Sequence, residues 1–202
     1  MKIENTLKEI CRLSAVNTSN ALSLLIDSQI NMELARTRIT KAEEAFTLLH
    51  REEIVAGIFM PITGDIEGSS LLVFPKESAF ALSDLLVKRE PGFTRKLNDL
   101  DISALKEVGN ILSGNFLAVF SNKLGIKVIE HVPYFSFDMF GALSSQLATK
   151  SVQNEKKALV IDIELSFMSA TCKGYFMLLF ELEEFIKIQE LLEKTNFEKP
   201  EK

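Results

Sequence analysis

Two long stretches of the chain carry apolar residues at helical spacing, with polar residues between them. They run from about residue 4 to 27 and from about residue 100 to 123. The apolar stripe of the second stretch consists of Leu105, Val108, Leu112, Phe116 and Val119. Each stretch is predicted to be an amphipathic helix with its stripe buried, and Asp99 or Asp101 is the predicted N-cap of the second helix.

Shorter apolar runs bounded by turn residues predict β-strands. The clearest runs lie at 52–62, 68–74, 157–167 and 172–182. They are predicted to form two hairpins, one in each half of the chain. Residues 30–40 and 126–140 have less regular strand patterns, residues 88–99 form a polar connection, and residues 144–156 are predicted to be a polar loop.

The two halves of the chain are related by an internal repeat. Leu7–Ile26 aligns without gaps on Leu105–Leu124, an offset of 98 residues, and Gly68–Leu86 resembles Gly174–Leu192. Each half therefore has a long helix, then strands, then a shorter helix. One half alone would make only a thin core, so we expect the halves to share one continuous sheet.

The expected fold is therefore α+β, as a single domain over residues 1–202. Two pseudo-symmetric αβββα-like repeats, about 4–90 and 100–195, share one mixed or antiparallel sheet. The two long helices are expected to lie packed side by side on one face of that sheet.

Composition narrows the function classes. The chain of 202 residues has a formal net charge of −5 and contains no block of lysine and arginine, which argues against a nucleic-acid partner. Its two cysteines, Cys11 and Cys172, form no CxxC motif, so neither a disulfide framework nor a zinc site is expected. The N-terminus is charged and no apolar run approaches the ~20 residues that span a bilayer, so we expect a cytoplasmic protein without membrane insertion.

The second long helix has a polar face opposite its apolar stripe. Ser103, Glu107 and Asn110 follow i, i+4, i+7 spacing and lie on one side of the helix. On spacing alone, the preferred interpretation is a solvated helix face. Asparagine is a poor helix former, however, and it stands beside Gly109, which is small enough to let another backbone approach closely.

Twenty-two residues separate Asn110 from Pro133. The pattern Asp/Ser-x3-Glu-x2-Asn-x22-Pro, with the two-repeat plan, resembles the signature of the CheC/CheX/FliY family of chemotaxis response-regulator phosphatases, CheC in particular. The resemblance covers most of the chain and implies one CheC-like domain. It also implies an enzyme, a hydrolase acting on the phosphoaspartate of a CheY-like response regulator in chemotaxis or related two-component signalling.

The resemblance gives roles to the four motif residues. Asn110 and Glu107 become the catalytic pair, with Ser103 and Pro133 as supporting residues. An amide suits the task, because its carbonyl accepts a hydrogen bond from water while its NH₂ donates to a phosphoryl oxygen. Glu107 is implied to dock against the receiver domain. No cofactor is expected on this chain, since the response-regulator substrate carries the Mg²⁺.

The first repeat keeps only part of this motif. Its corresponding positions, at the 98-residue offset, are Asn5, Glu9, Arg12 and Ala35. Arginine has no hydrogen-bond acceptor and cannot orient water as an amide does. We therefore predict a degenerate first site at Glu9 and Arg12 that does not hydrolyse, and we prefer to interpret these two residues as an i, i+3 surface pair.

Two other function classes are compatible with the same residues. One is a non-catalytic scaffold that binds a response regulator, the deamidase CheD or flagellar switch proteins. The other is a purely structural, partner-binding sheet. A scaffold would bind the phosphorylated regulator without speeding its decay, whereas a structural protein would show no preference for the phosphorylated form.

Overall fold

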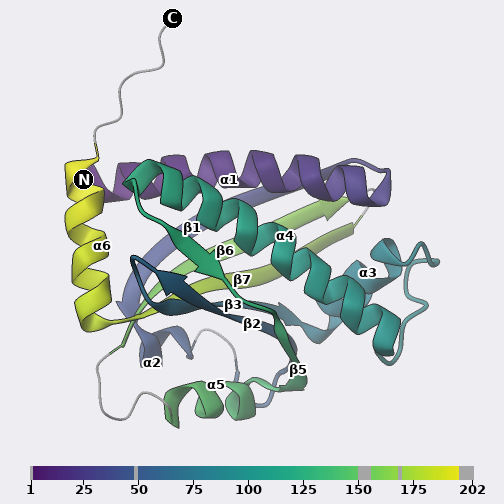
Figure 1. The fold of residues 1–202 in the computed structure, drawn as a ribbon. Coiled ribbons are helices and arrows are strands. Elements are labelled where there is room, and N and C mark those ends of the chain that lie inside the picture. The colour runs from purple at the N-terminus through teal and green to yellow at the C-terminus, as the bar shows by residue number, and fades with distance from the viewer. Residues whose placement is uncertain (1, 48–49, 150–155, 168–169, 196–202) are drawn as a thin grey trace, which may run out of the picture.

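The computed structural model describes residues 2–47, 50–149, 156–167 and 170–195. These residues form six helices and seven strands (Figure 1). In chain order the elements are α1 (Lys2–Ile26), β1 (Ile30–Lys41), α2 (Ala42–Ala45), β2 (Ile54–Gly64), β3 (Gly68–Pro75), α3 (Lys76–Leu86), α4 (Asp99–Leu124), β4 (Val128–Glu130), β5 (Tyr134–Met139), α5 (Phe140–Thr149), β6 (Lys156–Phe167), β7 (Ala170–Glu181) and α6 (Leu182–Lys194). The two long helices and the four clearest strands lie where the hydrophobic pattern predicts them.

All the described strands belong to one antiparallel sheet, in which the two halves exchange their outer strands. The strand order is β1-β6-β7-β3-β2-β4, and β5 also pairs with β2. The first half thus adds β1 to the β6–β7 hairpin of the second half, while β4 and β5 add to the β2–β3 hairpin of the first. The shared sheet is confirmed, and of the two predicted arrangements it is the antiparallel one.

The two hairpins meet at the centre of the sheet, where β3 lies beside β7. Leu71 pairs with Met177 across this junction. The same two residues correspond by repeat, because helices α3 and α6 also begin 106 residues apart, at Lys76 and Leu182. A residue that pairs with its own counterpart marks the pseudo-twofold axis between the repeats.

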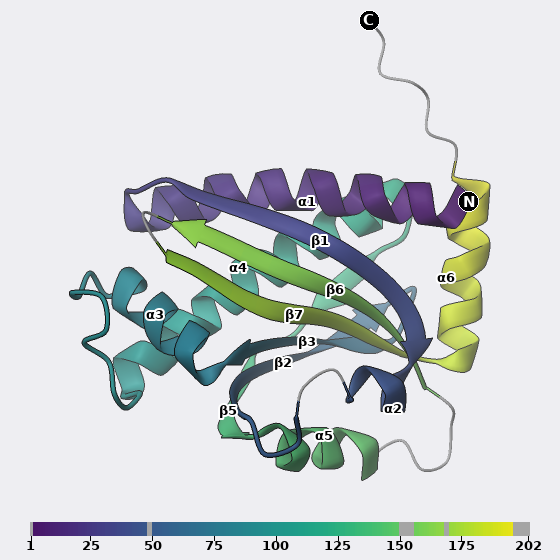
Figure 2. The same cartoon turned by 180° about the vertical axis from the view of Figure 1, so that it is seen from behind.

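Helices cover the two faces of the sheet unequally (Figure 1 and Figure 2). The long helices α1 and α4 pack against each other on one face, as predicted. They enclose the larger core, in which Phe116 stacks on Phe120 and meets Phe176 edge-on. The short helices α2 and α5 lie on the other face and close a smaller core around Phe46 and Phe140.

Helix α5 differs from the sequence prediction, whereas the shorter helices α3 and α6 end the two repeats as expected. Residues 144–149 were expected to be loop, yet they belong to α5, because the start of this helix buries Phe140 and Leu143 against the second face of the sheet. This packing is tertiary, and the local polar composition gives no sign of it. Of the rest of the expected loop, residues 150–155 lie outside the described residues, and Lys156 is the first residue of β6.

Helix α4 begins one residue after Asn98, so neither predicted N-cap is correct. The Asn98 side chain accepts hydrogen bonds from the backbone N–H groups of Leu100 (2.9 Å) and Asp101 (3.2 Å). Asp101 accepts in turn from the Asn98 backbone N–H (2.8 Å), which completes a capping box with Asp101 at its third helical position. At the other end Gly125 takes a left-handed conformation (φ 67°) and ends the helix.

Candidate functional site

The predicted site residues of the second repeat stand together on the outer face of α4. Ser103, Glu107 and Asn110 are all exposed. The Asn110 amide donates a long hydrogen bond, Nδ2 to Oε2, to Glu107 (3.4 Å). The helix therefore presents a carboxylate and an amide side by side to the surroundings, and both keep most of their hydrogen-bonding capacity free for another molecule.

The opposite face of α4 fixes how far these groups project from the sheet. The predicted apolar stripe is buried at all five of its positions. Gly109, next to Asn110, is buried directly over Ile58 of β2, and a Cβ atom added to it would lie 2.8 Å from Ile58 Cγ2. The close approach that this glycine permits is thus to the protein's own sheet. Gly114, by contrast, has open space around it.

Pro133 lies in the break between β4 and β5, beside the same part of α4. Glu130 pairs with Ile62 and Tyr134 pairs with Phe59, so the three residues of the break face two residues of β2. Proline lacks the N–H that a ladder needs, which suits this interruption. The next residue but one, Phe135, pairs with Ile58, the residue beneath Gly109. The break therefore adjoins the helix at the level of Asn110.

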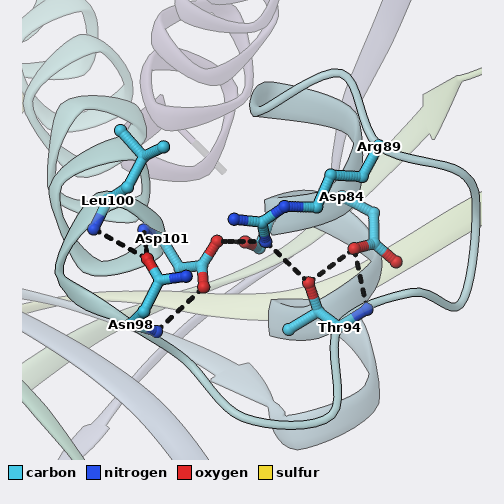
Figure 3. Close-up of polar contacts among 7 residues, drawn as sticks. Asp84, Arg89, Thr94, Asn98, Leu100 and Asp101 are labelled. Carbon is cyan, nitrogen blue, oxygen red and sulfur yellow. Dashed lines mark hydrogen bonds and ion pairs between the residues drawn. The ribbon is translucent and has the colours of Figure 1, made fainter.

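A buried polar network, missed in the sequence analysis, anchors the first turn of α4 to α3 (Figure 3). Arg89 donates from Nη1 to Asp101 Oδ1 (2.5 Å) and to Thr94 Oγ1 (3.0 Å). Asp84 accepts from the Thr94 backbone N–H (3.0 Å), and Ser83 donates to Asp101 (2.7 Å). These contacts fix the connection between the two halves to the first turn of α4, and they thereby set the orientation of this helix.

Asp101 is the ionised centre of this network. Its side chain is fully buried, and burial, the largest single influence, acts to raise its pKa. Hydrogen bonds from the Asn98 backbone, Ser83 and Arg89 together outweigh burial and lower the pKa below the ordinary value. The carboxylate is therefore charged and fully partnered, and a buried charge in that state holds its neighbours in one arrangement.

A second polar cluster, also missed, lies between α4 and the sheet. Ser70 of β3 donates to Glu130 Oε1 (2.9 Å), and Ser113 of α4 also donates to Glu130 and contacts the Ser70 hydroxyl (3.0 Å). The three residues are separated by 43 and 17 positions in sequence, so no local pattern points to them. We call Ser70, Ser113 and Glu130 the serine–glutamate cluster.

The first repeat has the same backbone plan but different chemistry. On α1, Arg12 donates to both carboxylate oxygens of Glu9, at 2.8 and 2.7 Å, and this contact lowers the pKa of Glu9. Strand β1 shifts register between Leu34 and Arg36, on either side of Ala35, which corresponds to Pro133. The irregular strand is therefore common to both repeats, whereas the pairing of amide and carboxylate occurs on α4 alone.

Other candidate chemistry is sparse in the described part of the chain. No group of three or more His, Cys, Asp or Glu residues is placed there to hold a metal ion. Both cysteines are free and buried, and burial raises the pKa of Cys11 to about 12 and of Cys172 to about 11. None of the described helices combines the length and the apolar character that crossing a membrane requires.

Comparison with known proteins places these residues in a family context. The profile of the CheC-like family matches residues 100–136, a segment that contains Ser103, Glu107, Asn110 and Pro133. The chain is 26% identical to the CheY-P phosphatase CheC of Bacillus subtilis over 187 residues, which is 90% of each protein.

Solved structures share the fold. FliY of Thermotoga maritima aligns with a TM-score of 0.78 at 19% identity, covering 96% of this chain and 97% of FliY. CheX of Borrelia burgdorferi, in a complex with CheY, BeF₃ and Mg²⁺, aligns with a TM-score of 0.51 at 16% identity, covering 83% of this chain and 96% of that one.

Proposed function

We propose that this chain, a member of the CheC/CheX/FliY family in sequence and fold, hydrolyses the phosphoaspartate of a CheY-like response regulator. One site on α4 performs the reaction, with Glu107 and Asn110 as its catalytic pair. The observation that carries the proposal is this exposed pair beside the Pro133 break, inside the segment that matches the family profile. The CheY-P phosphatase name of the B. subtilis relative and the CheY partner of B. burgdorferi CheX support the substrate class.

Asn110 orients the attacking water. Phosphoryl transfer depends mainly on positioning and on charge stabilisation, and an acyl phosphate needs a water molecule held in line with the bond that breaks. The Asn110 carbonyl accepts from that water, and its NH₂ leaves the long contact with Glu107 to donate to a phosphoryl oxygen. A 3.4 Å hydrogen bond at an exposed position is weak, so this exchange requires little energy.

Glu107 fixes the helix on its partner. An exposed carboxylate one turn before Asn110 is placed to meet a cation on the receiver, and such a contact sets the register of docking. We assign the metal to the substrate: the receiver domain brings Mg²⁺, and this chain contributes the amide and the carboxylate. Ser103 and Pro133 support the site. Ser103 lies near the start of α4, and Pro133 shapes the adjacent strand break.

The test is the decay of phosphate from a purified CheY-like receiver with Mg²⁺, with and without this protein. We expect wild-type protein to accelerate decay and Asn110→Ala to lose about 100-fold or more of that acceleration, because water positioning is lost. Binding of the Asn110→Ala variant to the BeF₃-activated receiver should stay close to wild type.

A matched control is available on the same helix. Asn122 is also an exposed asparagine of α4, three turns further along, and Asn122→Ala should behave as wild type. Unchanged decay in the presence of wild-type protein that still binds the activated receiver would replace the phosphatase with the scaffold hypothesis. Equal binding to activated and inactive receiver would contradict both.

A further inference from the structure

The serine–glutamate cluster connects the site helix to the strand that leads into the Pro133 break. Ser113 lies on α4 one turn after Asn110, and Glu130 is the last residue of β4, three positions before Pro133. Ser113 and Ser70 are fully buried and Glu130 is half-buried. The cluster is thus an internal polar contact between the two elements that form the proposed site.

The serine–glutamate cluster is expected to stabilise the fold less than apolar residues at the same positions would. Burial raises the pKa of Glu130, and the two serine hydroxyls only partly offset this effect. Its hydrogen bonds in the described structure come from these neutral hydroxyls. A half-buried carboxylate satisfied only by neutral hydroxyls generally stabilises a fold less than apolar side chains of similar size would.

The positions related to the cluster by the internal repeat provide a comparison within the same chain. At the 98-residue offset Ser113 corresponds to Ala15 and Glu130 to Met32, and at the 106-residue offset Ser70 corresponds to Phe176. All three counterparts are buried apolar residues. The same fold therefore has apolar side chains at the repeat-related positions that belong with α1, the helix that carries Arg12, and polar side chains at the cluster beside α4, the helix that carries Asn110.

We propose that Glu130, through Ser113, is a positioning residue that sets the rotation and height of α4 and so places the Asn110 amide relative to the Pro133 break. This inference rests on the proposed phosphatase function. Gly109 lets α4 lie close to Ile58 but offers no side chain to stop the helix from turning or sliding. Apolar contacts are non-directional, whereas the hydrogen bonds of Ser113 fix both a distance and an angle.

The experiment compares wild type with Glu130→Gln and with the apolar triple variant Ser70→Ala, Ser113→Ala, Glu130→Met, which makes the cluster apolar and has at positions 113 and 130 the residue types of Ala15 and Met32. Three quantities are measured: decay of receiver phosphate, affinity for the BeF₃-activated receiver, and the NMR signals of the Asn110 side-chain amide. We expect both variants to stay folded and to bind within about twofold of wild type, while their acceleration of decay falls about tenfold or more. The Asn110 amide signals should shift in both variants.

A control carboxylate is offered by Glu164 of β6, which is half-exposed and lies in the other hairpin. Glu164→Gln should leave all three quantities unchanged. If wild type accelerates decay while Glu130→Gln matches it in rate and in Asn110 signals, the positioning role is overturned. Parallel losses of folding stability, affinity and rate would also overturn it, since they indicate a general structural role.

The two proposals fail separately. If wild-type protein accelerates the decay of no receiver, the phosphatase function fails, and the Asn110 amide signals still decide whether Glu130 positions that side chain. Unshifted signals in both variants would then exclude the positioning role without reference to catalysis.

Discussion

Arg12 holds both carboxylate oxygens of Glu9 on the surface of α1, through hydrogen bonds of 2.8 and 2.7 Å. At the corresponding positions of α4, Asn110 and Glu107 share one bond of 3.4 Å. Arg12 and Glu9 use their hydrogen-bonding groups on each other, because a guanidinium group and a carboxylate match in shape and charge. The second pair leaves its groups available, and this difference assigns the proposed chemistry to the second repeat.

Arg12→Ala should therefore leave turnover unchanged. The residue is exposed and forms its ion pair with Glu9 of the same helix, so its removal frees that carboxylate without disturbing α4. The measurement is receiver dephosphorylation at several enzyme concentrations, with the thermal unfolding midpoint as a check on folding. A loss of rate comparable to that of Asn110→Ala would contradict the assignment of a single site.

Glu107→Ala should weaken affinity and rate together. Loss of one charged contact to the receiver is expected to reduce affinity about tenfold, since hydrogen bonds to charged groups contribute about 1.5–3 kcal/mol. Glu107→Gln keeps the shape without the charge and should fall between wild type and Glu107→Ala. Titration against the BeF₃-activated receiver separates affinity from rate, and an affinity unaffected by either change would remove the docking role.

Gly109→Ala should reduce activity more than stability. The added Cβ would lie 2.8 Å from Ile58 Cγ2, so α4 must lift away from the sheet and carry Asn110 with it. Overpacking costs about 1–3 kcal/mol, and alanine's better helix propensity returns up to about 1 kcal/mol. Unfolding in denaturant and receiver dephosphorylation, measured on the same samples, give the two effects.

Two further variants check the cause of the Gly109 effect. Gly114→Ala meets open space and should stabilise the protein by up to about 1 kcal/mol through helix propensity. Combining Gly109→Ala with Ile58→Ala removes the clashing methyl group, so the double variant should be less destabilised than the sum of the single ones. Strict additivity would show that the contact with Ile58 is not what excludes a side chain at Gly109.

Asp101→Asn should destabilise the fold at neutral pH by about 3 kcal/mol, because it leaves the partly buried Arg89 side chain, 19% exposed, without its charged partner. The folded-state pKa of Asp101 lies below its unfolded value of about 3.9, so its ionised form stabilises the fold fully above that pH and loses this effect as the pH falls through the folded-state pKa. The difference between wild type and variant should therefore narrow under acid conditions. Urea unfolding between neutral and acid pH measures it.

A neighbouring aspartate provides the control for that series. Asp99 is exposed in the same first turn, and Asp99→Asn should change stability by no more than about 1 kcal/mol through the helix dipole. A pH-independent gap between wild type and Asp101→Asn would contradict the role given to ionised Asp101.

The sequence predicted the features that depend on the spacing of nearby residues. The spacing of Leu105, Val108 and Leu112 located α4, and the repeat led to one shared sheet. The α4 N-cap was missed because Asn98, Asp99 and Asp101 all favour that position, and only the reciprocal bonds of the capping box select Asn98.

What the sequence could not reveal depends on contacts between distant residues. Gly109 is visibly small, but which neighbour it approaches is decided by the sheet beneath it. Ser113 contacts Glu130 only because β4 folds back under α4. Likewise, Arg89 contacts Asp101 only because the loop between α3 and α4 brings the two residues together. The catalytic roles of Glu107 and Asn110 stay predictions until a receiver is assayed.

Because the two repeats exchange strands, the proposed site on α4 depends on residues of both repeats. β2 belongs to the first repeat, yet it supports Gly109 through Ile58 and pairs with both strands that flank the Pro133 break. Substitutions in β2 are therefore expected to disturb the proposed site, whereas Arg12→Ala is expected to leave it in place. A genetic screen for inactive variants should therefore recover substitutions in both repeats, although the residues proposed to meet the phosphoryl group belong to the second.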